Sequence, residues 1–321
     1  MEDTTLKAIE AAAERGEPIG EKLAMSVLEA STKVLPRLFS VAGAVRSRRF
    51  GEKISLCSIV NAKGGACPED CAFCAQSSRH HTGAKAVPLF SEEELVEAYE
   101  SAAKQPIGHL GVVTSGCALS PEGVERICQA IASKKAPGVE WCASLGCLET
   151  EQLAALKRAG LKRFHHNLEA APSFFPSICT THTFEQRLAT VRSAREAGLE
   201  VCCGGIMGVG ESLEQRVELA LLLAREAVDS IPLNFLIPIP GTRLGDMTPM
   251  RPLDMIRTVV MFRLTNPSAE VRVCAGRAHL RDLQGMIFLG GANGMMIGPL
   301  LTVAGRSMED DLQMLRDMEM L

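Results

Sequence analysis

Three cysteines stand close together in the chain: Cys67, Cys71 and Cys74. The spacing C-x3-C-x2-C puts three thiolates on one short loop, where they can converge on a cube of iron and sulfide and leave one iron without a protein ligand. Zinc is the alternative metal. A structural zinc site needs four ligands, however, and the nearest histidines, His80 and His81, follow only after several polar residues. The pattern therefore predicts a 4Fe-4S cluster with an open iron.

The elements that must position this loop follow from a repeating pattern after residue 53. Runs rich in β-branched and apolar residues alternate with helical patterns, which predicts eight strands. The expected strands are Ile54–Val60, His109–Gly116, Val139–Gly146, Arg163–Glu169, Val201–Gly208, Ser230–Ile237, Glu270–Gly276 and Gly294–Gly298. Successive β-then-α units predict an α/β fold of the (β/α)8 TIM-barrel type, with a doubly wound open sheet as the alternative.

The start of the chain differs from the repeat. Residues 1–53 are expected to form one or two helices, over Leu23–Glu29 and Leu35–Arg49, that make a helical cap on the barrel. Residues 54–321 are expected to form the barrel as a single domain. The three-cysteine loop then follows the first strand at the carboxyl end of the barrel, where barrel enzymes build their active sites.

Composition argues against several function classes. The net charge of -4, from 34 basic and 38 acidic residues without long runs, offers no basic surface for nucleic acid or for an acidic membrane. Aromatic residues make up only 4%, which is too few for base-stacking platforms. Without an apolar stretch of about 20 residues or a secretory signal, a cytoplasmic location is expected, where the cysteines stay reduced.

Four further cysteines fall on the expected strands one, three, five and seven: Cys57, Cys142, Cys202 and Cys274. Inward side chains of a (β/α)8 barrel stack in layers drawn from alternate strands, so these four thiols are expected to converge. Arg272 shares a face with Cys274, because the two are two residues apart on a strand. Thiolates favour a soft metal centre, so the quartet predicts a second cluster; simple core packing is the alternative.

Other cysteines and histidines lie near the quartet positions in the sequence and could face the same interior. Cys203 should point away from Cys202 and pack in the core, because strand side chains alternate. Of His165 and His166 only one can face inward. Cys117 and Cys147, just past strands two and three, are the substitute ligands if the quartet is incomplete.

The cysteine loop, with Phe73 before its last cysteine, resembles the signature of the radical S-adenosylmethionine (SAM) superfamily. The stretch 204–211 resembles that superfamily's glycine-rich motif at strand five, with Gly205, Ile206 and Gly208 as cofactor-binding positions. In that superfamily SAM chelates the open iron, and an electron from the cluster cleaves it to a 5′-deoxyadenosyl radical. The resemblance implies that Phe73 lies against the adenine.

Along nearly the whole chain the resemblance narrows to the biotin synthase family. The segments that carry it are Ala66–Cys71, His166–Glu169, Thr180–Arg187, Ile231–Asn234 and Val271–Arg277. The resemblance implies a sulfurtransferase that inserts sulfur between two unactivated carbons of dethiobiotin, with SAM as radical source and an auxiliary iron-sulfur cluster as sulfur donor. It also implies a flavodoxin or ferredoxin as reductant and leaves a homodimer open.

The same resemblance assigns roles to four polar residues. Asn167 and Asn234 match asparagines that contact dethiobiotin or SAM, while Glu169 and Arg187 match polar residues of the SAM site. Strand-end asparagine and glutamate also serve as turn or cap residues, which is the alternative for each of them.

The auxiliary cluster departs from the best-known members of the family, which use three cysteines and an arginine for a 2Fe-2S centre. Cys142, Cys202 and Arg272 match three of these positions, but Thr114 is expected to replace the strand-two cysteine. The other two cysteines of the quartet stand where the common form has serine. This pattern resembles the second class of biotin synthases, so a four-iron auxiliary cluster is favoured over 2Fe-2S.

Two other functions stay open at this point. A radical SAM enzyme of the mutase or hydrogenase-maturation type would share the barrel without inserting sulfur. A non-catalytic iron-sulfur or zinc protein would serve electron transfer or scaffolding. Detection of an auxiliary cluster would argue against the mutase or hydrogenase-maturation type. Reductant-dependent 5′-deoxyadenosine production would exclude the non-catalytic protein.

Overall fold

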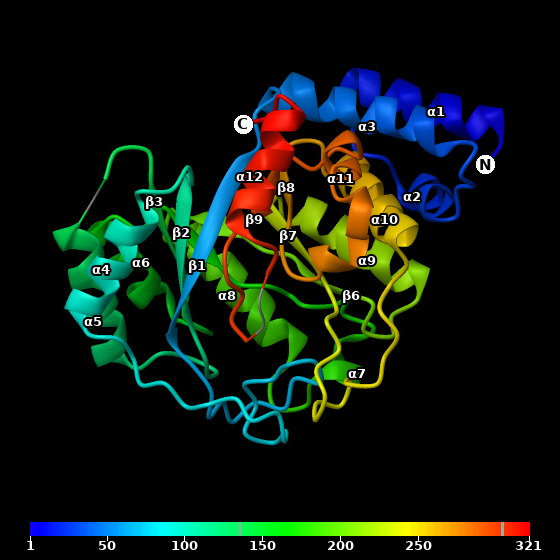
Figure 1. The fold of residues 1–321 in the computed structure, drawn as a ribbon. Coiled ribbons are helices and arrows are strands. Elements are labelled where there is room, and N and C mark those ends of the chain that lie inside the picture. Colours follow the sequence, from blue (N-terminus) through cyan, green and yellow to red (C-terminus); the bar gives the residue numbers. More distant parts are fainter. Residues whose placement is uncertain (135, 303–304) are drawn as a thin grey trace.

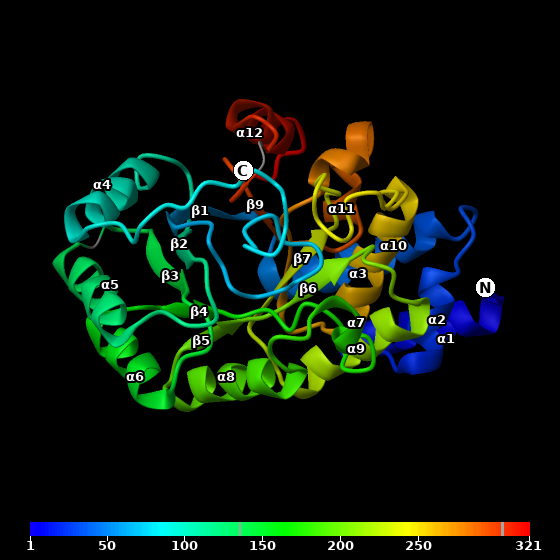
Figure 2. The same ribbon diagram turned by 90° about the horizontal axis from the view of Figure 1, so that it is seen from below.

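The computed structural model describes residues 1–134, 136–302 and 305–321. Within these ranges, nine strands form one parallel sheet in the order β5-β4-β3-β2-β1-β9-β8-β7-β6, and a pairing between β5 and β7 closes it into a ring (Figures 1 and 2). β5 and β6 are two parts of a single expected strand. The expected (β/α)8 barrel is therefore confirmed, and the open sheet is wrong.

The strands agree closely with the sequence pattern. They are β1 Ser55–Lys63, β2 His109–Thr114, β3 Glu140–Ser144, β4 Arg163–His165, β5 Glu200–Cys202, β6 Gly205–Met207, β7 Ser230–Phe235, β8 Glu270–Val273 and β9 Gly294–Met296. The largest differences are at β4, which is shorter than expected, and at the gap between β5 and β6.

Proline explains that gap. Pro232 lies in β7 beside it and has no N–H to donate to the sheet. At Gly204, a Cβ atom would lie 2.1 Å from the Pro232 carbonyl oxygen, so only glycine allows the two strands to approach this closely. The ladder resumes where Gly205 pairs with Leu233.

Helices cover the outside of the barrel. They are α4 Glu92–Ala102, α5 Pro121–Ser133, α6 Thr150–Ala159, α7 Phe175–Ile178, α8 Phe184–Glu196, α9 Leu213–Arg225, α10 Pro252–Thr265, the 3-10 helix η1 Arg277–Leu283, α11 Met286–Leu289 and α12 Met308–Asp317. The side chain of Ser91 caps α4 in a capping box with Glu94, and Gly160 ends α6 in the left-handed conformation. In the described part of the chain, no helix is long and apolar enough to cross a bilayer.

The N-terminal segment contains one more helix than the sequence pattern indicated. α1 (Asp3–Arg15) precedes α2 (Glu21–Leu28) and α3 (Leu35–Phe50), and the three pack together against α9, α10 and α11. The buried face of α1 consists of Leu6, Ile9, Ala12 and Ala13, which recur at the spacing of a helix. In Figure 1, α1 and α3 lie at the end of the barrel opposite the loop that follows β1.

Candidate functional site

A cavity of about 350 Å³ occupies the barrel interior. Its lining includes most of the residues predicted to be functional, which are Cys57, Phe73, Cys74, Cys142, Asn167, Glu169, Cys202, Ile206, Asn234, Arg272 and Cys274. The blue-to-cyan segment after β1 lies over the end of the ring of strands in Figure 2. One chamber therefore joins the cysteine quartet to the three-cysteine loop.

The four quartet cysteines face this chamber from four different strands or strand ends. Cys142, Cys202 and Cys274 are each 8% exposed, and Cys57 is half-buried. Burial raises the pKa of each thiol. Negative charge on Cys57 and Cys202 raises the pKa of Cys142 and of Cys274 further, as expected for groups that converge. The structure thus brings together the layer that the alternate-strand pattern predicted.

Two buried polar atoms beside the quartet have no partner within the described residues. They are Nη1 of Arg272 and Nδ1 of His109, and both side chains line the cavity. The Cα of His109 pairs with that of Cys57 across β1 and β2. Because an unpaired buried donor or acceptor is costly, these atoms indicate that the cavity is built to hold a polar or charged group. Thiols, an arginine and an imidazole suit an iron-sulfur cluster.

An ion-pair network lies next to the quartet, close to the amino ends of the strands. Glu270 accepts hydrogen bonds from Arg272 (2.7 Å) and from Arg163 (2.8 Å), and Arg163 also binds Glu200. Burial acts to raise the pKa of Glu270, but the two guanidinium groups outweigh it and lower that pKa to about 2. Arg272 is thereby held with its unpaired nitrogen in the cavity.

At the carboxyl ends of the strands, Glu169, Asn167 and Arg187 form one hydrogen-bonded group. Arg187 donates to the Asn167 carbonyl oxygen (2.6 Å) and to the Glu169 carboxylate (3.4 Å), and the Asn167 amide donates to the same carboxylate (3.3 Å). The backbone of Glu169 is left-handed, with φ of 66°. A glutamate rarely adopts this strained conformation, which is typical of functional sites.

The other predicted ligand-binding residues also lie at this end. The Asn234 amide donates to the Gly205 carbonyl oxygen (3.3 Å) and accepts from the Ala275 N–H (3.1 Å), so it ties β6 to the end of β8. A Cβ on Gly205 would lie 2.5 Å from the Glu169 carbonyl oxygen. Gly208 is left-handed (φ 84°), and its N–H donates to Glu211. Of the glycine-rich positions Gly205, Ile206 and Gly208, Ile206 is the one that lines the cavity.

The three-cysteine loop folds back on itself. The Cys67 N–H donates to the Gln76 carbonyl oxygen (3.0 Å), and the Cys74 N–H donates to the Cys71 carbonyl oxygen (3.0 Å). Burial raises the pKa of Cys74, and Cys67 adds to this effect. Hydrogen bonding to Cys179 and burial raise the pKa of Cys71, with a further contribution from Cys74. The three thiols therefore share one locality, as the spacing predicted.

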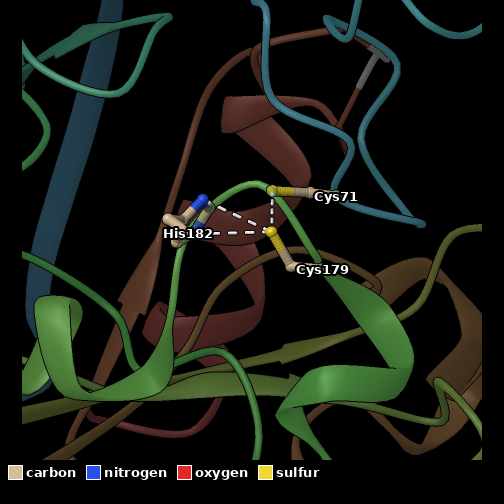
Figure 3. A group of neighbouring side chains, drawn as sticks. All are labelled: Cys71, Cys179 and His182. Carbon is tan, nitrogen blue, oxygen red and sulfur yellow. Dashed lines mark hydrogen bonds between the residues drawn. The ribbon is translucent and has the colours of Figure 1, made fainter.

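Cys71 points toward a second loop, as Figure 3 shows. Its Sγ lies 3.9 Å from Sγ of Cys179, whose own Sγ lies 3.3 Å from Nδ1 of His182. Among the described residues, this is the group of three ligand atoms that lie within 4.8 Å of one another. Both ring nitrogens of His182 already have partners, Glu69 at 2.6 Å and Arg187 at 3.2 Å. The geometry therefore favours a hydrogen-bonded histidine over a zinc ligand.

The structure settles several secondary expectations. Thr114 was the wrong residue for the strand-two position: it pairs with Lys63 and lies outside the cavity lining. Gly111, whose Cα pairs with that of Cys142, takes that position. Gly111 has no side chain that would distinguish it from its neighbours in the sequence, so Thr114 was taken for this position of the strand.

Other neighbours behave as the strand pattern predicted. Cys203 is fully buried in the apolar core, away from the cavity. His165 lines the cavity, with Nδ1 3.4 Å from Sγ of Cys202. His166 faces outward, and its Nε2 lies 3.9 Å from Sγ of Cys147. Cys117 is exposed beside Cys147, so neither joins the quartet lining.

Four charged or polar groups of the site were not predicted from the sequence: His109, Arg163, Glu270 and His182. His109 and Arg163 line the cavity and lie opposite Cys57 and Cys142 in the sheet. Glu270 stands two residues before Arg272 on β8, so the period-two spacing of a strand was the available signal for it. His182 lies within the Thr180–Arg187 segment together with its partner Arg187, but its other partner, Glu69, comes from the distant three-cysteine loop.

Comparisons with known proteins agree with this geometry. Residues 62–223 match the model of the Radical SAM superfamily, and residues 232–321 match the Biotin and Thiamin Synthesis associated domain. The chain therefore belongs to the radical SAM class of enzymes.

Relatives narrow the class. The biotin synthase of Maridesulfovibrio salexigens is 51% identical over 99% of this chain and 98% of its own length. That of Geotalea uraniireducens is 45% identical over 99% of this chain and 98% of its own length. The chain belongs to the biotin synthase family, and the mutase, maturase and non-catalytic alternatives are not supported.

Solved structures bear on the fold alone. Methylornithine synthase superimposes with a TM-score of 0.83 at 18% identity, covering 97% of this chain and 96% of its own. HydG, a maturase of the [FeFe]-hydrogenase, gives a TM-score of 0.83 at 15% identity over 99% of this chain and 75% of its own. Both share the closed barrel seen here.

Proposed function

We propose that this chain converts dethiobiotin to biotin with two iron-sulfur clusters at opposite ends of its barrel cavity. Cys67, Cys71 and Cys74 hold the 4Fe-4S cluster that binds SAM. A second, auxiliary cluster is held by the layer formed by Cys57, Cys142, Cys202 and Cys274. The observation that carries the proposal is the one cavity that is lined by the quartet, by Cys74, and by the predicted SAM-site residues Phe73, Glu169 and Ile206.

The bound groups supply the radical chemistry and the transferred sulfur. The chain's own residues bind, orient and shield. Glu169 and Arg187 present paired charges for the polar groups of SAM, while Phe73 offers an aromatic face to its adenine. Asn167 and Asn234 provide amide groups at the height where dethiobiotin would lie. The closed ring of strands encloses the cavity, and such enclosure limits side reactions of a reactive intermediate.

We favour a four-iron auxiliary cluster over a 2Fe-2S centre. Four thiols, instead of three, surround the cavity, and Gly111, which pairs with Cys142, brings no side chain to it. Arg272 contributes an unpaired nitrogen that would face the cluster or its sulfide. Electrostatic attraction from a cation suits an anionic cluster.

Four wider proposals complete this function. We propose that residues 54–321 act as one domain, with residues 1–53 as its helical extension, because α2 and α3 pack on barrel helices and α1 packs on α2 and α3. We propose a cytoplasmic location and a flavodoxin or ferredoxin as reductant, in keeping with free cysteines and a reductive reaction. A homodimer is the oligomeric state to test first.

The experiment compares Cys274→Ala with Cys203→Ala, a matched buried cysteine that faces the core. In anaerobically reconstituted enzyme, Cys274→Ala should lower iron and sulfide content, still release 5′-deoxyadenosine, and form little or no biotin. Cys203→Ala should keep both clusters and biotin formation. Wild-type iron equal to a single 4Fe-4S cluster, or full biotin formation by Cys274→Ala, would return the quartet to a packing role.

A further inference from the structure

His182 connects the three-cysteine loop to the proposed SAM site. It is 8% exposed and lies between Glu69, two residues before Cys71, and Arg187 on α8. Its Nδ1 lies 2.6 Å from the Glu69 carboxylate, and its Nε2 lies 3.2 Å from Nη1 of Arg187. A continuous chain of hydrogen bonds therefore runs from the cluster loop to the end of β4.

The partners of His182 fix its tautomer. Arginine can only donate, so Nε2 must accept the hydrogen bond from Arg187. Nδ1 then carries the ring proton and donates it to the carboxylate of Glu69. One neutral tautomer satisfies both contacts, so the imidazole links the Glu69 carboxylate to the Arg187 guanidinium group in one orientation.

Each end of this link is itself anchored. Glu69 also accepts a hydrogen bond from the Thr181 hydroxyl (2.5 Å), which keeps its carboxylate beside His182. Arg187 donates to the Asn167 carbonyl oxygen (2.6 Å) as well as to Glu169. A shift of His182 would therefore move the guanidinium group relative to the loop that carries Cys71.

We propose that His182 is a positioning residue that fixes Arg187, and through it the SAM site, relative to the three-cysteine loop. SAM must reach the open iron of the cluster and the polar groups at the strand ends at the same time. The separation between these two contact points depends on the Glu69–His182–Arg187 link. This inference rests on the proposed SAM site.

The test measures SAM affinity by equilibrium binding to anaerobically reconstituted enzyme, together with its iron content. His182→Leu removes both hydrogen bonds at similar volume, and should weaken SAM binding about tenfold, or about 1.4 kcal/mol, at unchanged iron content. His182→Gln keeps one donor and one acceptor, and should stay within about threefold of wild type. Cys179→Ala, which alters the adjacent thiol but not the link, should bind SAM as wild type does.

Other outcomes would overturn the inference. SAM affinity of His182→Leu within about twofold of wild type would refute a positioning role, as would equal losses in the Leu, Gln and Cys179 variants, which would indicate packing. If His182→Leu does not fold, Glu69→Ala breaks the same link from its other end and should give the same loss; wild-type affinity there would refute the inference. Arg187→Met separates the two proposals, because an unchanged affinity in that variant would refute the SAM site itself.

Discussion

Replacing Glu270 by glutamine tests the ion-pair network beside the cysteine quartet. The side chain is 20% exposed and bridges Arg163 and Arg272, which are 8% and 3% exposed. The pKa of Glu270 falls from an ordinary value of 4.5 to about 2. Since each pKa unit is worth about 1.36 kcal/mol, Glu270→Gln should lower the free energy of unfolding by roughly 3 kcal/mol at pH 7.

The sign of the pH dependence follows from the direction of the shift. A carboxyl group whose pKa is depressed by folding stabilises the native state above its unfolded pKa, and this contribution is lost as protons bind. The stability difference between wild type and Glu270→Gln should therefore be constant from about pH 8 to pH 5. It should shrink below pH 4.5 and vanish near pH 2.

Urea unfolding followed by circular dichroism measures this difference, on cluster-free protein so that acid does not release sulfide during the titration. Glu200→Gln is the matched control, because Glu200 also pairs with Arg163 but is 31% exposed and should cost less. A loss below about 1 kcal/mol for Glu270→Gln, or one equal to the control, would refute the buried-network argument.

Three further predictions concern the two ends of the cavity. Cys71→Ala should abolish 5′-deoxyadenosine release while the circular dichroism spectrum of the barrel persists; normal release would contradict the cluster assignment. Asn167→Ala and Asn234→Ala should each lower kcat/KM for dethiobiotin about 5- to 100-fold at unchanged iron content, since an unpaired buried partner costs roughly 1–3 kcal/mol. Gly205→Ala should displace the backbone of Glu169, because the new Cβ would lie 2.5 Å from its carbonyl oxygen, and SAM binding should weaken; wild-type affinity would show that the strand ends adapt.

Much of the barrel was predictable because parallel strands buried on both faces appear as apolar runs with turn residues after them. The quartet was also predictable, since a side-chain period of two fixes which residues of one strand face inward. The helix α1 was not predicted, although its buried residues Leu6, Ile9, Ala12 and Ala13 recur at helical spacing and offered the same kind of signal. The interruption after β5 depends on Pro232 of a different strand, and no local pattern reports such a contact.

Charged partners were harder to predict than cysteines. Arg163, Glu200 and Glu270 stand on three strands, and their pairing depends on the closure and register of the barrel. The contact of His182 with Glu69 is likewise non-local, because it joins two loops that are 113 residues apart in the sequence. A metal-binding motif has a local spacing that chemistry restricts, whereas an ion pair needs only two side chains that meet in space. Which residue of β2 lies at the level of Cys142 also depends on how the strands pair. Thr114 was therefore assigned to a position that Gly111 occupies.

β4 and the residues that follow it run along the whole length of the site. Arg163, His165, Asn167 and Glu169 recur at every second residue and all line the cavity. Because a strand rises about 3.3 Å per residue, Arg163 and His165 lie roughly 7 Å apart along the cavity, and Asn167 and Glu169 follow beyond the end of β4. Arg163 belongs to the ion-pair network, His165 touches Cys202, and Glu169 binds Arg187. On the proposed assignments, a substrate held at the height of Asn167 lies between the auxiliary cysteines and the SAM site, so that hydrogen abstraction and sulfur delivery approach it from opposite sides.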